Sequence, residues 1–419
     1  MTFLNFSMFA HVDADAFFAS ALMRKRPDLR GKPLLALGMG GGCVIAASYE
    51  AKAFGVKTGM RLSEAKKLCP QATALPSDFE EALLASKQIE GMLGNRCPLM
   101  EQYSVDEWFL DLRTLPGGVP ENLGHYLTEI QSAIGRSVGL TISIGTGPSK
   151  LLAKMASEYR KPAGITALTP NPSPVTGEGR RGGGLSIEEF LRSRSAAAIP
   201  GIGPRRQLLA RAHGWETAWD IAHADILLIK KLLGEPGVMM QRELLGEATE
   251  GIAEFPAPPK SVSRCRSFPA SRDREMVYGH LLHHLTYTML KMRREGLACR
   301  ALSVWLRDGK YEHQGTDMKL PLPVDTEEQA LPYVEKCFQR LWEDGYRCTQ
   351  TGLALRGLNP KGGTQYSLFE SAKHTEGAEK VQSALDKLHD KYGRGVINRG
   401  GAMKTAGPGK KKLSVAEAK

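Results

Sequence analysis

The chain has 419 residues, a hydrophobic content of 42% and a formal net charge of +11. This length exceeds one ordinary core, so roughly two to four domains are expected, and no apolar run approaches the roughly 20 residues that span a membrane. An integral membrane protein is thereby excluded, and the excess of Lys and Arg favours a polyanionic partner, although many basic proteins bind none.

The first part of the chain is predicted to alternate between strands and helices, which indicates an α/β or α+β catalytic core. Strands are expected at 8–13, 34–37, 43–47 and 140–144, and a β-hairpin at 101–111. Helices are expected at 16–26, 49–54, 62–68, 78–94, 121–138 and 150–159.

Two breaks follow this core. Residues 168–185 are rich in Pro and Gly and predict a flexible linker or inserted loop, and 247–259 predict a second linker. A small helical unit is expected between them. Beyond them the patterns predict strands at 262–268, 301–307 and 352–357, with helices at 274–295, 327–343 and 376–392.

The cysteines and the N-terminus bear on location. The 7 cysteines are odd in number and scattered, with no Cys-x-x-Cys pair, so neither a disulfide framework nor a zinc site is indicated. Residues 1–10 lack the basic start and cleavage site of a signal peptide. We therefore expect a cytoplasmic protein.

Acidic residues stand where two of the predicted strands end. Asp13 ends the first strand, and Asp106 and Glu107 lie near the turn of the hairpin. Carboxylates that folding brings together at strand ends can hold Mg²⁺ or Mn²⁺ against a substrate phosphate. Each of these residues could instead cap a turn or a helix. Together with the basic charge, the pattern indicates nucleotidyl transfer on nucleic acid.

Four segments resemble the Y-family DNA polymerases, the translesion enzymes, and most of all the bacterial DinB (polymerase IV) and UmuC type. They are His11–Ser20, Ala46–Val56, Ser104–Asp111 and Ser143–Gly164. The resemblance implies an α+β multidomain right-hand fold, with a βαββαβ-like palm, small fingers, a helical thumb and an α+β little finger. These parts would occupy 8–30 with 75–167, 31–74, 186–246 and 260–358 in that order, followed by a flexible tail at 359–419.

The resemblance also implies a two-metal site. The family aspartate that matches Asp13 binds both ions, and the carbonyl that matches Ala14 helps to bind the ion on the nucleotide side. Asp106 and Glu107 complete the site. Two Mg²⁺ ions, with Mn²⁺ as a substitute, would activate the primer 3′-hydroxyl and stabilise the leaving pyrophosphate. Asp15 is expected to cap the following helix and not to bind metal.

The nucleotide contacts are implied in the same way. Phe18 matches the steric gate that excludes a ribose 2′-hydroxyl, while Phe17 either belongs to the core or also faces the nucleotide. Tyr49 and Lys52 match the fingers Tyr and Arg that contact the triphosphate, although Lys52 lacks the bidentate fork of an arginine. Lys161 matches the lysine that reaches the triphosphate.

Two further segments are expected to hold the DNA backbone. In the thumb, Gly201 and Gly203, followed by Arg205, resemble a helix-hairpin-helix turn whose backbone approaches phosphates. The little finger opens with a strand that the family uses to hold DNA without reading its sequence, which predicts salt-sensitive binding. An ordinary turn and a solvated strand face are the alternatives. The strand residues concerned are Lys260, Ser261, Ser263 and Arg264.

A short peptide in the tail matches the one by which bacterial polymerases bind the β sliding clamp. It is Gln365-Tyr-Ser-Leu-Phe369, with Gln365, Leu368 and Phe369 as anchors for a pocket. A chance pentapeptide in a flexible tail is the alternative.

These features predict template-directed, low-fidelity DNA synthesis without proofreading, in DNA repair under the SOS response. The expected partners are primer–template DNA, dNTP and the clamp, for a monomer that acts at the nucleoid. The alternative is a non-catalytic accessory protein that binds DNA and clamp, which the departures at Ala21, Ala46, Lys52 and Ser149 keep open and the three carboxylates oppose. A generic basic nucleic-acid-binding protein would explain only the charge.

Overall fold

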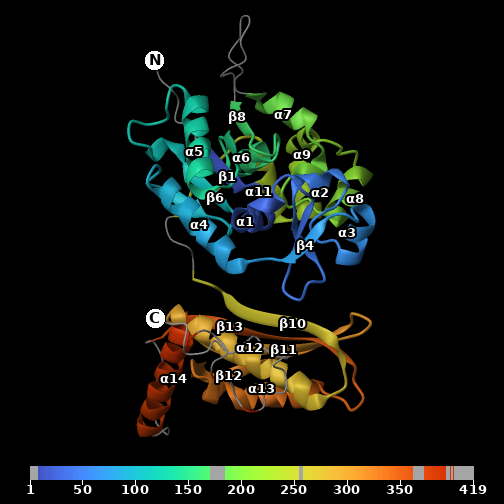
Figure 1. Ribbon diagram of the computed structural model, residues 1–419, viewed down its shortest axis with the longest axis vertical. Coiled ribbons are helices and arrows are strands. Elements are labelled where there is room, and N and C mark those ends of the chain that lie inside the picture. The colour runs from blue at the N-terminus through green and yellow to red at the C-terminus, as the bar shows by residue number, and fades with distance from the viewer. Residues whose placement is uncertain are drawn as a thin grey trace, which may run out of the picture. The chain divides into compact units, whose positions relative to one another are not determined.

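The computed structural model describes residues 8–169, 185–253, 258–361, 372–392, 397 and 400. The chain divides into two compact units, Met1–Pro256 and Ala257–Lys419 (Figure 1). Each unit contains sheets and helices, in agreement with the predicted α+β class. Among the described residues, no helix is both long enough and apolar enough to cross a membrane.

A six-stranded sheet with the order β5-β6-β1-β7-β8-β9 is the largest sheet of the first unit. Its central strand β1 is buried throughout and pairs antiparallel with β6 and β7. This burial on both sides holds the polar side chains of β1 in place. The strands are β1 (Phe9–Ala14), β5 (Met100–Gln102), β6 (Glu107–Asp111), β7 (Ile142–Gly147), β8 (Ile165–Thr169) and β9 (Leu185–Ser186).

Side chains of β1 alternate between the two faces of this sheet. Ala10, Val12 and Ala14 join the hydrophobic core that α4 (Phe79–Gly94) and α5 (Leu123–Val138) complete. His11 faces the opposite side and contacts Ser157 at the end of α6 (Lys150–Ser157). The polar residues of β1 are therefore held between its sheet and α6.

The close approach of α6 depends on a glycine. A Cβ at Gly145 in β7 would lie 2.1 Å from the backbone nitrogen of Ser157 and 2.2 Å from the carbonyl oxygen of Ala153. Only glycine leaves room for helix backbone at this distance. Gly145 thus allows the polar residues of α6 to reach the face of the sheet that carries His11.

A smaller sheet with the order β3-β2-β4 has its own buried core. The sequence analysis missed β4, because this short strand is half exposed and is defined by its parallel pairing with β2. The helices and strands of this part of the chain are α1 (Phe17–Lys25), β2 (Leu34–Leu37), β3 (Val44–Ala47), α2 (Tyr49–Ala53), α3 (Leu62–Leu68) and β4 (Thr73–Pro76).

The predicted helical unit is present and shares a core with α6. Its helices are α7 (Ile187–Ser193), α8 (Pro204–Ala212), α9 (Ala218–Ala222), α10 (Ile226–Leu233) and α11 (Glu235–Leu244). Local sequence patterns do not predict β8 and β9, which pair in parallel at the two ends of the predicted insertion. Most of that insertion lies outside the described residues. Short 3₁₀ turns occur at Pro27–Leu29, Leu112–Thr114 and Ala196–Ala198.

The second unit is a four-stranded sheet with the order β10-β13-β11-β12. The predicted helices α12 (Arg274–Arg294) and α13 (Glu327–Leu341) share its hydrophobic core. Local sequence patterns do not predict β12, an edge strand whose first half, from His313 to Lys319, is mostly polar and at least partly exposed. The strands are β10 (Ser261–Ser271), β11 (Leu297–Asp308), β12 (His313–Val324) and β13 (Cys348–Pro360).

The predicted tail helix is present as α14 (Ala372–Tyr392), attached to the second unit by ion pairs. Nε and Nη2 of Arg293 in α12 lie 2.6 and 2.7 Å from the two carboxylate oxygens of Asp386. Arg294 pairs with Asp390. Helix α14 is thus held to α12 by charge-assisted contacts.

A buried histidine in α12 makes the second unit sensitive to acid. His284 is 1% exposed, and its Nε2 lies 3.0 Å from Oγ1 of Thr351. Burial, together with the charge of Arg264, lowers the pKa of His284 from 6.5 to about 3. Because the unfolded chain takes up this proton at higher pH than the folded chain, the stabilisation is lost as pH falls below 6.5.

We expect the free energy of unfolding to fall by roughly 2–3 kcal/mol between pH 7 and 4.5 through this one group. Urea unfolding of the whole chain at both pH values, compared with His284→Gln, measures the effect. The variant should lose less stability on acidification than the wild type. Equal losses in the two proteins would show that this proton uptake does not control acid stability.

Candidate active site

The pairing of β1 with β6 brings the two acidic segments together. Asp13 and Glu107 stand opposite each other in the antiparallel register. The backbone N–H of Ala14 donates to the carbonyl of Asp106 at 2.9 Å. Segments distant in the sequence therefore meet at one end of β1, as the strand-end pattern predicted.

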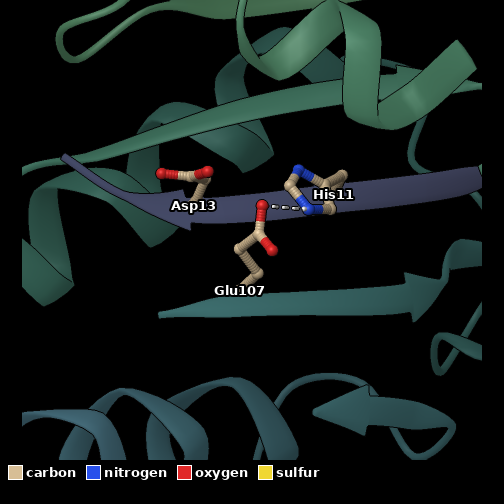
Figure 2. A group of neighbouring side chains, drawn as sticks. All are labelled: His11, Asp13 and Glu107. Carbon is tan, nitrogen blue, oxygen red and sulfur yellow. Dashed lines mark ion pairs between the residues drawn. The ribbon is translucent and has the colours of Figure 1, made fainter. Parts of the chain in front are cut away.

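Three side chains converge there. Ligand atoms of His11, Asp13 and Glu107 all lie within 4.8 Å of one another. Figure 2 shows Glu107 reaching from β6 toward His11 on β1, with Oε1 of Glu107 3.5 Å from Nε2 of His11. Asp106 is not part of this group, and its Oδ1 instead accepts a hydrogen bond from the Ser104 hydroxyl at 2.5 Å. Of the three predicted carboxylates, those of Asp13 and Glu107 thus lie close together, whereas that of Asp106, the residue before Glu107, lies outside the group.

The protonation of His11 follows from its contacts. Burial, together with Lys154 and Lys161, lowers the pKa of His11 well below its ordinary value, so the ring is neutral. The Ser157 hydroxyl donates to the carbonyl of Lys154 at 2.8 Å, so Nδ1 of His11 donates to the Ser157 oxygen at 2.7 Å. Nε2 then carries a lone pair that faces a carboxylate oxygen and has no hydrogen-bond donor.

Two ammonium groups neutralise the acids. Nζ of Lys161 lies 2.7 Å from Oδ1 of Asp13 and 2.5 Å from Oε1 of Glu158, and Lys154 pairs with Glu107. Burial raises the pKa of Asp13 to about 8 although Lys161 opposes this. Burial acts to lower the pKa of Lys161, but Asp13 and Glu158 outweigh it and the pKa is raised.

These residues fit a divalent cation. Two carboxylates and an orphaned imidazole nitrogen face one another, and both carboxylates already hold cationic groups. Oxygen ligands of this kind suit Mg²⁺ or Mn²⁺. The sequence analysis did not place His11, Lys154 or Glu158 in the site. A signal existed for His11, since it lies two residues before Asp13 and so shares its strand face.

The predicted nucleotide contacts lie around α1 and α2. The Tyr49 hydroxyl donates to Oδ1 of Asp15 at 3.3 Å, and Nζ of Lys52 lies 4.4 Å from the Tyr49 ring centroid. Burial, with the charge of Asp15, raises the pKa of Tyr49, and burial lowers the pKa of Lys52. Phe18 is half-buried, with its ring 5.4 Å from that of Phe79 in an edge-on arrangement.

Two expectations need correction. Asp15 does not cap α1, because the residue before that helix is Ala16, in a left-handed conformation without a side-chain cap. Instead, the buried Asp15 carboxylate accepts hydrogen bonds from Ser143, Tyr49 and Ala163. Phe17 is 2% exposed within the main core, which supports the core alternative and not its predicted contact with the nucleotide.

The predicted DNA contacts lie on other elements. Gly201 has a left-handed φ of +95°, Gly203 directly precedes α8, and Arg205 is exposed on the first turn of that helix. In the second unit, Ser261 and Ser263 are exposed on β10 and alternate with a core residue. Lys260 is exposed as well, whereas the Arg264 guanidinium lies 4.0 Å from the Tyr287 ring centroid on α12. Gln365, Leu368 and Phe369 lie outside the described residues.

Comparison with known proteins decides the family. The model described as "impB/mucB/samB family" matches residues 12–158, and that of its C-terminal domain matches 259–368. The chain is 31% identical over 409 residues to DNA polymerase IV of Moorella thermoacetica, covering 94% of this chain and 96% of that protein. This chain belongs to the impB/mucB/samB family, the Y-family DNA polymerases of DinB/UmuC type. The predicted family is thereby confirmed.

Other relatives agree. Protein ImpB of Salmonella typhimurium is 29% identical over 405 residues, covering 93% of this chain and 92% of that protein. A Y-family DNA polymerase chimera of Dbh and Dpo4 has the same fold, with a TM-score of 0.70, 22% identity, and coverage of 84% of this chain and 99% of that chain. The predicted right-hand α+β fold is confirmed. The activity is that of a DNA-directed DNA polymerase of the translesion type, and family membership implies use of a divalent metal.

Proposed function

We propose that Asp13, Asp106 and Glu107 hold two Mg²⁺ ions for the transfer of a nucleotide from dNTP to a primer 3′-hydroxyl. The observation that carries this is the convergence of the Asp13 and Glu107 ligand atoms within 4.8 Å, with Asp106 adjacent through the backbone of Ala14. When bound, the ions would lower the pKa of the 3′-hydroxyl and neutralise the charge of the leaving pyrophosphate. The Ala14 carbonyl would add a ligand on the nucleotide side.

A lysine ammonium group that pairs with an acid in the structure would bind the substrate triphosphate instead. Lys161 pairs with Asp13 in the structure, and its ammonium could instead bind an arriving triphosphate, which would leave the Asp13 carboxylate free to hold a cation. Tyr49 and Lys52 would contact the same triphosphate. The half-buried Phe18 would pack against the deoxyribose and exclude a 2′-hydroxyl. The burial of Phe17 supports a packing role for that residue.

Substrate DNA would be held by residues outside this site. We assign the palm to 8–30 and 75–167, the fingers to 31–74, the thumb to 186–246 and the little finger to 260–358. Exposed backbone at Gly201 and Gly203, with Arg205, suits phosphate contacts. Lys260, Ser261, Ser263 and Arg264 would hold the backbone in the little finger. A monomer acting in the cytoplasm, at the nucleoid, is proposed.

Metal removal tests the proposed chemistry. Purified chain should extend a primer on template DNA with dNTP and Mg²⁺, and an excess of EDTA should abolish extension, because the lysine ammonium groups can bind the triphosphate but cannot activate the 3′-hydroxyl as a bound ion would. Gel analysis of primer length measures the effect, and added Mn²⁺ should restore synthesis. Extension that continued in EDTA would contradict a metal-dependent mechanism.

Clamp binding is a separate proposal that rests on the peptide Gln365–Phe369. A Leu368→Ala/Phe369→Ala double variant should bind purified bacterial β clamp at least about 10-fold more weakly, since two apolar anchors would be lost. Surface plasmon resonance measures the affinity, and primer extension without clamp should remain unchanged as the control. Clamp affinity equal to that of the wild type would remove this assignment.

A further inference from the structure

We propose that Asp15 is a positioning residue for the incoming nucleotide, which holds Tyr49 and the Lys161–Gly164 segment in one arrangement. The inference rests on the proposed function, because it takes Tyr49 and Lys161 as triphosphate contacts. Asp15 lies two residues beyond Asp13 on the chain. It would act through its neighbours and not by touching the substrate.

The contacts of this carboxylate join three separate segments. Asp15 is 1% exposed. Its Oδ1 accepts from the Ser143 hydroxyl of β7 at 2.8 Å and from the Tyr49 hydroxyl of α2 at 3.3 Å. Its Oδ2 accepts from the backbone N–H of Ala163 at 2.8 Å. A buried carboxylate with three donors from three segments is expensive to disturb, because any donor left behind loses its partner away from water.

The segment beyond Lys161 needs this support. Ala163 has a φ of +56°, a left-handed conformation that residues with a Cβ rarely adopt. Its N–H is bound by Asp15, and its carbonyl accepts from Nε2 of Gln131 at 2.9 Å. Strained backbone of this kind persists only where its surroundings over-determine it.

The next residue adds a steric constraint. A Cβ at Gly164 would lie 2.1 Å from the carbonyl oxygen of Arg160, so the turn is closed tightly. The N–H of Gly164 also donates to the Ser143 hydroxyl at 3.4 Å. The Asp15 carboxylate and its partner Ser143 therefore fix the position of this turn. That position determines where the Lys161 side chain starts from the backbone.

Two of the three predicted triphosphate contacts are thus tied to neighbouring acids at the end of β1. Lys161 is bound by Asp13 and Tyr49 by Asp15. Loss of the Asp15 carboxylate would free the Tyr49 hydroxyl and the Ala163 N–H together. A small displacement of groups that bind substrate is sufficient to lower catalytic efficiency by about 10²-fold.

Steady-state primer extension with Asp15→Ala and Asp15→Asn tests the inference. Asp15→Ala should raise KM for dNTP roughly 10- to 100-fold, with kcat at saturating dNTP changed by less than about 3-fold. Asp15→Asn, which keeps the volume and one acceptor for Ala163, should fall between this variant and the wild type. Affinity for primer–template, measured by fluorescence anisotropy, should not change. Ser20→Ala is the matched control, because the Ser20 hydroxyl donates to the backbone carbonyl of Asp15 and not to its carboxylate.

A double-mutant cycle separates positioning from general loss of structure. If Asp15 acts through Tyr49, the KM effects of Asp15→Asn and Tyr49→Phe should be less than additive. A KM for dNTP equal to that of the wild type in both Asp15 variants would overturn the inference, and so would additive effects in the cycle. Calorimetry can also measure the affinity of a non-hydrolysable dNTP for the complex of the chain with primer–template. It compares the wild type with the same variants without turnover. Should the wild type bind this analogue but fail to extend a primer, the proposed function would fail while the role of Asp15 could still be measured.

Discussion

Asp106→Ala is expected to lower the rate of primer extension by about 10³-fold or more, with binding of primer–template retained. The carboxylate lies beside the group of His11, Asp13 and Glu107 and accepts a hydrogen bond from the nearby Ser104 hydroxyl. It is half-exposed, so its removal leaves no large cavity. The loss should therefore appear in catalysis and not in stability. Single-turnover extension in Mg²⁺, with thermal unfolding of both proteins, measures each quantity.

A matched control is available in the same unit. Glu129 on α5 is a carboxylate whose side chain is 63% exposed and lies outside the acidic group. Glu129→Gln removes the same charge and should extend primers as the wild type does. Extension by Asp106→Ala at the wild-type rate would contradict the proposed role. DNA binding without extension by either the wild type or the variant would instead favour the accessory-protein alternative, which the comparisons with DNA polymerase IV do not favour.

Phe18→Ala is expected to reduce discrimination against ribonucleotides by roughly 10- to 200-fold, the range that the shape of an apolar pocket can supply. The Phe18 ring is half-buried and lies edge-on to Phe17 and Phe79, with centroid separations of 5.5 and 5.4 Å. Alanine would open the space that a 2′-hydroxyl needs. The ratio of kcat/KM for dNTP to that for rNTP, on one template position, measures the effect.

A second variant tests how the Phe18 ring is held. Phe79 is 44% exposed, and Phe79→Ala removes one neighbour of the ring while leaving the ring itself. Its effect on sugar discrimination should be smaller than that of Phe18→Ala. Unchanged discrimination in Phe18→Ala, together with normal extension by dNTP, would show that another residue excludes the ribose hydroxyl.

Most of the secondary structure could be predicted from the sequence, because it depends on local patterns. Local signals include the alternation of apolar and polar residues in β1 and the spacing of the buried residues Leu127, Ile130 and Ile134 on α5. Another is Gly139, which has a left-handed conformation at the end of that helix. The missed strands lacked such signals. β12 is an edge strand whose first half is mostly polar, and β4 and β8 are short strands recognised by their parallel partners. Strands of this kind are defined by pairing, which a single segment does not reveal.

The candidate site likewise has features that local sequence predicts and features that it does not. Asp13, Asp106 and Glu107 could be named in advance, because acidic residues at strand ends follow from local patterns and from family motifs. The ammonium groups on two of them could not, since Lys154 and Lys161 reach the acids only after α6 and the following turn pack against the sheet. The role of Asp15 was mistaken for the same reason. Capping is a local expectation, whereas its three donors come from distant segments.

Sequence patterns alone predict most of the strands and helices, the basic charge, and the residue types that a metal-dependent polymerase needs. Contacts between distant segments establish which charges neutralise one another, that the Phe17 ring is buried whereas the Phe18 ring is half-buried, and which carboxylate binds Tyr49 and Ala163. The physical reason is that propensity and periodicity act over a few neighbouring residues. Burial, ion pairing and the pKa of Asp13 depend on atoms that the β1–β6 and β1–β7 pairings and the packing of α6 bring together from distant parts of the chain, as between His11 and Ser157, which are 146 residues apart.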